Sequence, residues 1–146
     1  MIKIKKAKIN QSQKIRALEN EIWDEEVVNI YDMAAFITFG YVFIAEDKNK
    51  IIGAICAFAT KNNEVYLNDW VVDKKHRGKG IGKKLFEKLK KEIGNKNIIS
   101  YVELKNGISV AAHKKLGFEL VKKVKDPYDL KKEEYRFFFR RKVESM

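Results

Sequence analysis

A buried strand that runs through a glycine-rich turn directly into a basic amphipathic helix constrains the fold of this chain most. The strand is expected at Val65 to Val72, and the turn begins at Asp73 and continues through Asp-Lys-Lys-His-Arg-Gly-Lys-Gly. From Ile81 to Ile93 apolar residues recur at three- and four-residue steps, which predicts a helix with one buried face. Another short strand, Ile98 to Glu103, follows it. The segment therefore predicts a β–helix–β crossover.

The other elements are predicted from the same periodicities. Ile2, Ile4 and Ile9 predict a short alternating first strand. Two helices (11–23 and 27–37) follow, and then two strands (41–45 and 51–59) that are joined by a polar hairpin turn. A helix (106–117) and two strands (118–124 and 135–141) complete the chain. The order βααβββαβαββ indicates an α/β (α+β) fold with a mixed, mostly antiparallel sheet flanked by helices. With 146 residues, one proline and no linker-like stretch, residues 1–146 are expected to form a single domain.

Composition excludes several classes of protein. The longest run without a charge, Met33 to Ala45, has 13 residues, whereas a membrane-spanning helix needs about 20. The lysine-rich start of the chain is not a secretory signal. Cys56 is the only cysteine, so neither an internal disulfide nor a cysteine metal cluster is expected. We expect a cytoplasmic protein without a metal.

The net charge of +11 predicts attraction to an anionic partner. Nucleic acid, a membrane surface and a phosphorylated cofactor would all satisfy it. A lysine-heavy surface that reflects genome composition explains the excess equally well, so charge alone does not select a function.

The glycine-rich turn has the properties of an anion site. Gly78, Gly80 and Gly82 lack β-carbons, so a ligand can approach the main chain closely. The first amides of the following helix have no internal acceptors, and the helix dipole favours negative charge there. Arg77, Lys79 and Lys83 add positive charge at the rim, although a tight strand–helix connection would use the same glycines. The turn is neither a P-loop nor a dinucleotide fingerprint, because the required spacings are missing.

Two motifs resemble the GCN5-related N-acetyltransferases. Arg77, Gly80 and Gly82 are similar to the R/Q-x-x-G-x-G/A motif of that family. Downstream, Asn106, His113 and the pair Gly117-Phe118 are similar to its N-x(6)-[YH]-x-x-x-G-F segment. The strand order also fits this family.

The resemblance implies that acetyl-CoA is the co-substrate and that a primary amine attacks it directly in a ternary complex. Main-chain amides would hold the pyrophosphate, namely those of Gly78, Lys79, Gly80, Ile81, Gly82 and Lys83. The backbone of Trp70, Val71 and Val72 would hold the pantetheine arm, which enters where this strand and the next splay apart. A main-chain N–H near Val71 or Val72 would stabilise the oxyanion.

Catalytic roles are implied by the same resemblance. Asn106 and His113 lie seven residues apart and share a helix face, so Asn106 would touch the cofactor arm while His113 reaches its sulfur. Family members usually carry Tyr as general acid where this chain has His113, and a histidine that only packs beneath the sheet is the alternative. Glu103 is the candidate general base; Asp69 replaces it only if a bulge turns it inward, and an ordered water chain is a third option.

The acceptor and the assembly are less constrained by the sequence. Ile22 to Tyr41 and Asp126 to Phe139 are expected to set acceptor specificity. The first half of the chain contains an acidic cluster, whose members are Glu19, Glu21, Asp24, Glu25, Glu26 and Asp32. This cluster either attracts a cationic amine or is ordinary charge on a helix surface. The family often forms homodimers. A non-catalytic acyl-CoA-binding module and, more weakly, a basic nucleic-acid-binding domain remain alternative functions.

Overall fold

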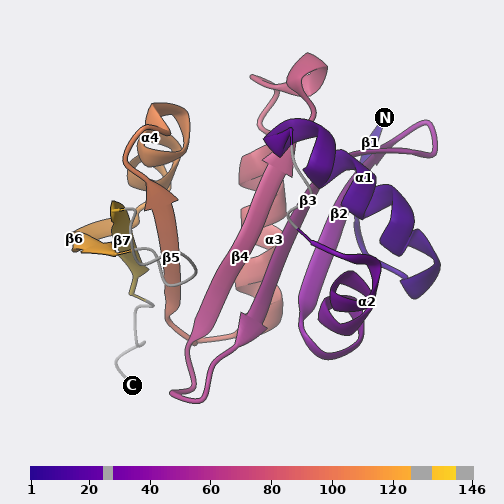
Figure 1. Ribbon diagram of the computed structural model, residues 1–146. Helices are drawn as coiled ribbons and strands as arrows, with labels where there is room; N and C mark the ends of the chain where they lie inside the picture. Colours follow the sequence, from indigo (N-terminus) through magenta and orange to yellow (C-terminus); the bar gives the residue numbers. More distant parts are fainter. Residues whose placement is uncertain (25–27, 126–132, 141–146) are drawn as a thin grey trace. The chain divides into compact units, whose positions relative to one another are not determined.

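The computed structural model describes residues 1–24, 28–125 and 133–140. Its strands are β1 (Ile2–Lys6), β2 (Tyr41–Asp47), β3 (Lys50–Ala59), β4 (Val65–Val72), β5 (Ile98–Glu103), β6 (Glu119–Lys125) and β7 (Glu133–Phe139). Its helices are α1 (Ser12–Trp23), α2 (Ile30–Phe39), α3 (Ile81–Ile93) and α4 (Gly107–Lys115), with short 3-10 turns η1 (Ile9–Gln11) and η2 (Lys74–His76). The predicted order βααβββαβαββ is confirmed (Figure 1).

Several predicted boundaries move by a few residues, among them the end of the first strand and the start of the second helix. Ile9 belongs to η1 and not to the first strand. The second helix begins at Ile30, because the Asn29 side chain accepts a hydrogen bond from the Asp32 amide at 2.9 Å and caps it. Residues 25–27, 126–132 and 141–146, which include parts of the predicted acceptor segments, lie outside the described residues.

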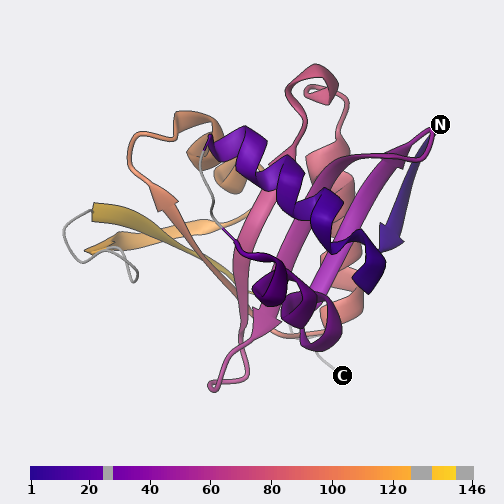
Figure 2. The ribbon, with the colours of Figure 1, turned by 45° about the vertical axis from the view of Figure 1, so that its right-hand side comes forward.

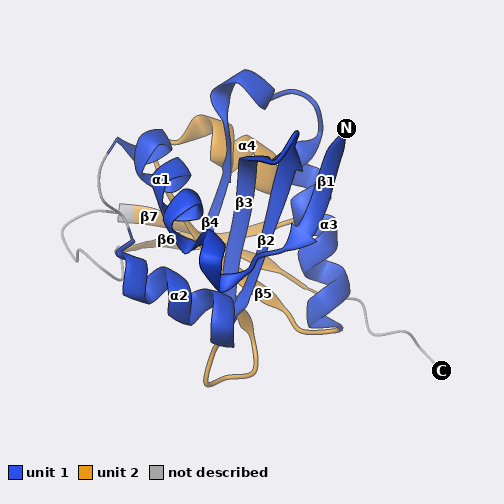
Figure 3. Cartoon of the chain, turned by 90° about the vertical axis from the view of Figure 1, so that its right-hand side faces the viewer, with its two compact units in different colours: residues 1–59, 68–94 blue, residues 60–67, 95–146 orange. Residues whose placement is uncertain are grey.

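The seven strands follow the order β1-β2-β3-β4-β5-β7-β6. The only parallel pair described is β4 with β5, whose ladder runs from Val65 opposite Ile98 to Leu67 opposite Ser100. The neighbouring pairs for which a register is described are antiparallel. The chain also divides into two compact units (Figure 3): residues 1–59 with 68–94, and residues 60–67 with 95–146. We refer to them as unit 1 and unit 2.

In unit 1, helices cover both faces of the strands. Helices α1 and α2 lie on one face and α3 on the other (Figure 2). Ala54 and Cys56 of β3 belong to one apolar cluster with Ile15 of α1. Gly53, which directly precedes Ala54 in β3, faces α3, because a β-carbon there would lie 3.2 Å from Leu85. The burial of Cys56, which is 1% exposed, confirms its prediction as a small core residue.

In unit 2, β5 and β6 pair with opposite edges of β7. Phe137 of β7 is completely buried, and Phe118, which precedes β6, is 4% exposed. These two rings form the apolar centre against which α4 packs its one buried residue, His113. Within the described residues of both units, no helix is long and apolar enough to cross a membrane.

Candidate functional site

The turn before α3 has an open main chain. Gly78 and Gly80 adopt φ values of +81° and +76°, which L-residues with side chains rarely adopt. A β-carbon built on either glycine meets no atom within 4 Å. Gly80 is the N-cap of α3, where no side chain caps the helix and the first turn holds no acidic residue. No side chain therefore occupies the amides at the start of α3, which remain available to an anion.

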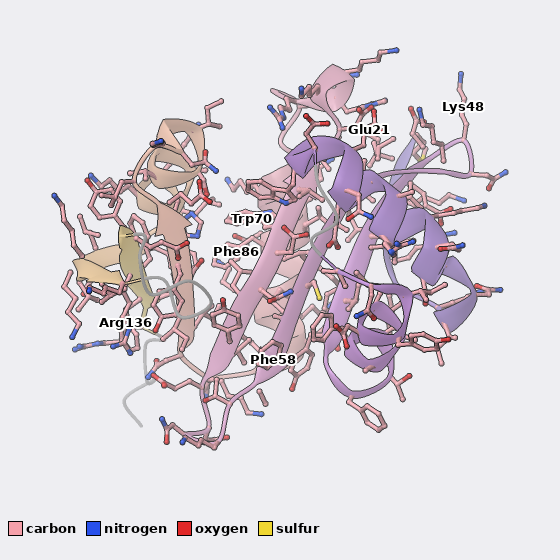
Figure 4. All side chains as sticks on the ribbon, in the orientation of Figure 1. Glu21, Lys48, Phe58, Trp70, Phe86 and Arg136 are labelled. Carbon is pink, nitrogen blue, oxygen red and sulfur yellow. The ribbon has the colours of Figure 1, made fainter. Side chains whose placement is uncertain are left out.

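The side chain of Trp70 contacts the first turns of α3 and holds them in place. Its indole Nε1–H donates to the Gly82 carbonyl at 3.1 Å. The ring stacks on Phe86, with centroids 5.5 Å apart and an interplanar angle of 29° (Figure 4). The side chain of Trp70 therefore fixes the helix end that presents the amides, which is a role that the sequence analysis did not assign to it.

Replacing Trp70 with phenylalanine tests this support. The ring stack on Phe86 is kept while the hydrogen bond to the Gly82 carbonyl is lost, so we expect the free energy of unfolding to fall by about 1 kcal/mol. Urea denaturation followed by circular dichroism measures it. An unchanged unfolding midpoint would show that this hydrogen bond does not contribute.

The rest of the turn is anchored by its own side chains. The Asp73 amide donates to the Ile52 carbonyl at 2.8 Å. The Asp73 carboxylate lies 2.9 Å from Nδ1 of His76, and this hydrogen bond lowers the pKa of Asp73. Arg77 donates through Nε to the Val72 carbonyl at 3.2 Å. Arg77 thus tethers the turn to the end of β4, while the exposed Lys79 is held by no described contact.

Some backbone groups of β4 already form hydrogen bonds within the protein. The Trp70 amide donates to the carboxylate of Asp69 at 2.9 Å, and the Val72 carbonyl accepts from Arg77. Val71 is 4% exposed and belongs to the apolar cluster under α1 and α2. In the parallel ladder with β5, no pair is described beyond Leu67 and Ser100, although both strands continue.

In unit 2, His113 is buried with both ring nitrogens engaged. It is 3% exposed. Nε2 lies 2.9 Å from the Ser100 hydroxyl, and Nδ1 lies 2.7 Å from the Ser109 carbonyl. Since a carbonyl only accepts, Nδ1 carries the proton and Nε2 accepts from Ser100. Burial lowers the pKa of His113 below its ordinary value of about 6.5, so the ring is neutral at pH 7. The role of Ser100 was not found from the sequence.

Asn106 and Glu103 lie at the start of α4. The Asn106 side chain caps that helix by accepting from the Ser109 amide at 3.0 Å. Glu103 is exposed at the end of β5, opposite Glu134 in the register with β7. Its carbonyl accepts from the Asn106 amide at 3.0 Å. These contacts position both residues, and their catalytic roles remain predictions.

Glu19 does not lie in the acidic surface cluster that the sequence predicts. Glu19 is completely buried. Burial and the nearby Asp69 carboxyl raise the pKa of Glu19 to about 10, and burial also raises the pKa of Asp69. Glu19 follows Ile15 by four positions and precedes Ile22 by three, so helical spacing already places it on the apolar face.

The predicted site residues thus form two groups. In unit 1, Trp70, Val71 and Val72 end the strand before the turn, and Arg77 to Lys83 form the turn and the start of α3. In unit 2, Glu103, Asn106 and His113 lie on β5 and α4. No group of three or more residues suited to hold a metal ion occurs in the described part of the chain.

A protein-family profile covers most of the chain. Residues 11–118 match the sequence profile of the acetyltransferase (GNAT) family. No protein of curated function matches the chain significantly.

Solved structures with the same fold are numerous. A GNAT-family acetyltransferase from Bacillus cereus aligns with a TM-score of 0.82 at 17% identity, covering 98% of this chain and 99% of the other. An aminoglycoside 6′-N-acetyltransferase complexed with coenzyme A gives 0.83 at 16% identity, covering 99% of each chain. A chain of the NatC complex bound to Gag peptide and CoA gives 0.78 at 23% identity, covering 97% and 99%. At these identities the similarity establishes the fold.

Proposed function

Because the chain belongs to the acetyltransferase (GNAT) family, we propose that it transfers an acetyl group from acetyl-CoA to a primary amine. The observation that carries this proposal is the uncapped N-terminus of α3, where Gly80 opens the main chain toward solvent. A solved relative of the same fold is complexed with coenzyme A, which supports the choice of donor. The cytoplasmic location expected from the sequence is part of the proposal.

The residues of the turn fit a diphosphate. The amides from Gly80 to Lys83 would donate to its oxygens, and the helix dipole adds to their attraction. Lys79 and Lys83 are exposed beside them. Arg77 is tethered to the Val72 carbonyl through Nε, which leaves the terminal nitrogens of its guanidinium as further donors. Gly78 lets the turn close without a side chain over the anion.

The end of β4 would hold the reacting part of the co-substrate. The Trp70 amide is already bonded to Asp69, so among the three predicted residues the amides of Val71 and Val72 are the better candidates for the pantetheine arm and the oxyanion. One such oxyanion donor typically contributes about 3–4 kcal/mol. Asn106 is proposed to contact the arm, as the family resemblance implies.

Proton transfer to the leaving thiolate is assigned by the resemblance to His113. In the structure its only N–H donates to the Ser109 carbonyl, so donation to sulfur requires that hydrogen bond to be exchanged. Glu103 is the base that the resemblance implies. Both ring nitrogens of His113 already form hydrogen bonds within the protein. This observation favours a second candidate function, a non-catalytic module that binds acyl-CoA.

The acceptor is proposed to be a cationic amine on a small molecule or a peptide. An aminoglycoside acetyltransferase and a complex bound to a peptide both share the fold, so the fold does not choose between them. A thiol-release assay with acetyl-CoA and a panel of polyamines, aminoglycosides and peptides makes this choice. We expect release with at least one amine class. Calorimetric binding of acetyl-CoA without release from any amine would support the binding module, and preferential binding of nucleic acid would contradict both.

A further inference from the structure

Unit 1 contains a pair of carboxyl groups that the proposed function has not used. Glu19 projects from α1 and Asp69 from β4, and the two side chains meet at the face of the strands covered by α1. Both oxygens of Glu19 and Oδ2 of Asp69 are buried, and no hydrogen-bond donor from the described residues reaches them. We call these two residues the Glu19–Asp69 pair.

Two ionised carboxylates in this position would repel each other without a compensating donor. A proton shared by the pair removes the repulsion and supplies the missing hydrogen bond. The raised pKa values of both residues agree with this reading. The other ionisable group of the described residues that faces the pair is the buried thiol of Cys56, whose pKa is raised by its own burial and by both carboxyls. One proton shared between the two carboxyls would leave the pair with a single negative charge.

The two oxygens of Asp69 have different surroundings. Oδ2 is buried and has no hydrogen-bond partner among the described residues. Oδ1 accepts from the indole Nε1–H of Trp23 at 3.2 Å and from the Trp70 amide at 2.9 Å. The contact with Trp23 is exposed to solvent, and Trp23 itself is 40% exposed. Asp69 is thus held firmly, with one oxygen reachable from outside and next to the strand proposed to bind the co-substrate.

We propose that Asp69 is the catalytic base, which accepts a proton from the acceptor ammonium group, and that Glu19 is a positioning residue that holds the shared proton against Asp69. This inference rests on the proposed function and deepens it, because an anionic oxygen beside β4 selects cationic amines. Glu103 would then not be needed as the base.

The proton and electron pairs balance as follows. The ammonium group gives one proton to Oδ1 of Asp69, and its freed lone pair forms the C–N bond at the thioester carbonyl. The C–S bond breaks and sulfur leaves with the electron pair. The second nitrogen proton replaces the proton that the sulfur takes from His113, and Asp69 releases its proton to water. Glu19 keeps the shared proton throughout.

Three variants test the proposal in the full chain. Asp69→Asn keeps the acceptor for Trp23 and Trp70 but removes the base, so we expect kcat to fall by about 100-fold or more while the Kd for acetyl-CoA stays unchanged. Glu19→Met removes the donor that favours ionised Asp69, so the acid limb of the kcat/KM profile should move to higher pH. Glu19→Gln restores a donor and should restore the profile.

The matched control is Lys14→Gln, on an exposed position of the same helix; its profile should equal the wild type. The titration of the Asp69 carboxyl carbon, followed by NMR without substrate, should move to higher pH in Glu19→Met alone. A wild-type kcat for Asp69→Asn, or loss of the acid limb in Glu103→Gln instead, overturns the proposal. If the wild type binds acetyl-CoA but acetylates no amine, the proposed function itself fails.

Discussion

Replacing Gly80 with valine is expected to lower the affinity for acetyl-CoA by about 100-fold. Gly80 has a φ of +76°, and a β-branched residue is strained there. Relief of that strain turns the first amides of α3 away from a bound diphosphate. A hydrogen bond to a charged group contributes about 1.5–3 kcal/mol, so the loss of one or two of them gives the stated effect. Isothermal titration calorimetry measures the change in Kd.

Gly94 provides the matched control at the opposite end of α3. It also has a positive φ, +67°, and a β-carbon there meets no atom within 4 Å. Gly94→Val should therefore strain the backbone without changing the affinity for acetyl-CoA. Equal affinities for Gly80→Val and the wild type would remove the turn from the binding site. Equal losses in Gly80→Val and Gly94→Val would mean that general destabilisation is the cause.

Replacing His113 with alanine is expected to lower the free energy of unfolding by about 2–4 kcal/mol. The ring packs against Phe118 and Phe137, with centroids 4.8 and 4.9 Å away. Its removal leaves a cavity, and the hydroxyl of Ser100 loses its hydrogen bond to the ring. Ser100 is only 3% exposed. Urea denaturation at pH 7.5 measures the loss, and Lys114→Ala, at the exposed next position, should have little effect.

The pH dependence of stability separates the role of the His113 ring from simple packing. Because burial lowers the pKa of His113 in the folded state, the unfolded chain binds more protons below about pH 6.5, the ordinary value. The preference of the folded state for the neutral His113 ring therefore stabilises the protein fully above that pH. This stabilisation is lost as the pH falls toward the pKa of His113 in the folded state. In His113→Phe the contribution should vanish. An equally steep loss in that variant would assign the effect to another group.

The kinetic prediction for His113 needs its own assay below the melting temperature of the variant. As general acid, His113→Ala should lower kcat by about 10²–10⁴, and His113→Tyr should keep activity because tyrosine is usual there in the family. If both variants retain wild-type rates, His113 is only a structural residue.

The sequence predicted the fold and the turn because both depend on local pattern. The apolar period of Ile81 to Ile93 and the glycines of the turn are readable in any context, and the corresponding α3 and its N-cap are observed. The resemblance also indicated Asn106 and His113, which lie at the two ends of α4.

The partners of these residues could not be read in the same way. Ser100 and His113 meet through the packing of β5 and α4, and Glu19 and Asp69 meet across α1 and β4. Such pairs depend on tertiary structure, and the charge of Glu19 favoured a position at the surface. Trp70 was assigned through its backbone alone, although its indole supports Gly82.

The burial of Cys56 has a practical consequence for detecting turnover. Reagents that report free thiols react with the thiolate form, and burial raises the pKa of this sulfur well above its ordinary value. The single cysteine of the chain therefore does not react with such reagents while the protein stays folded. With the folded protein, the signal of the thiol reagent would come from released coenzyme A. A slow increase of that signal without an amine would indicate unfolding that exposes Cys56.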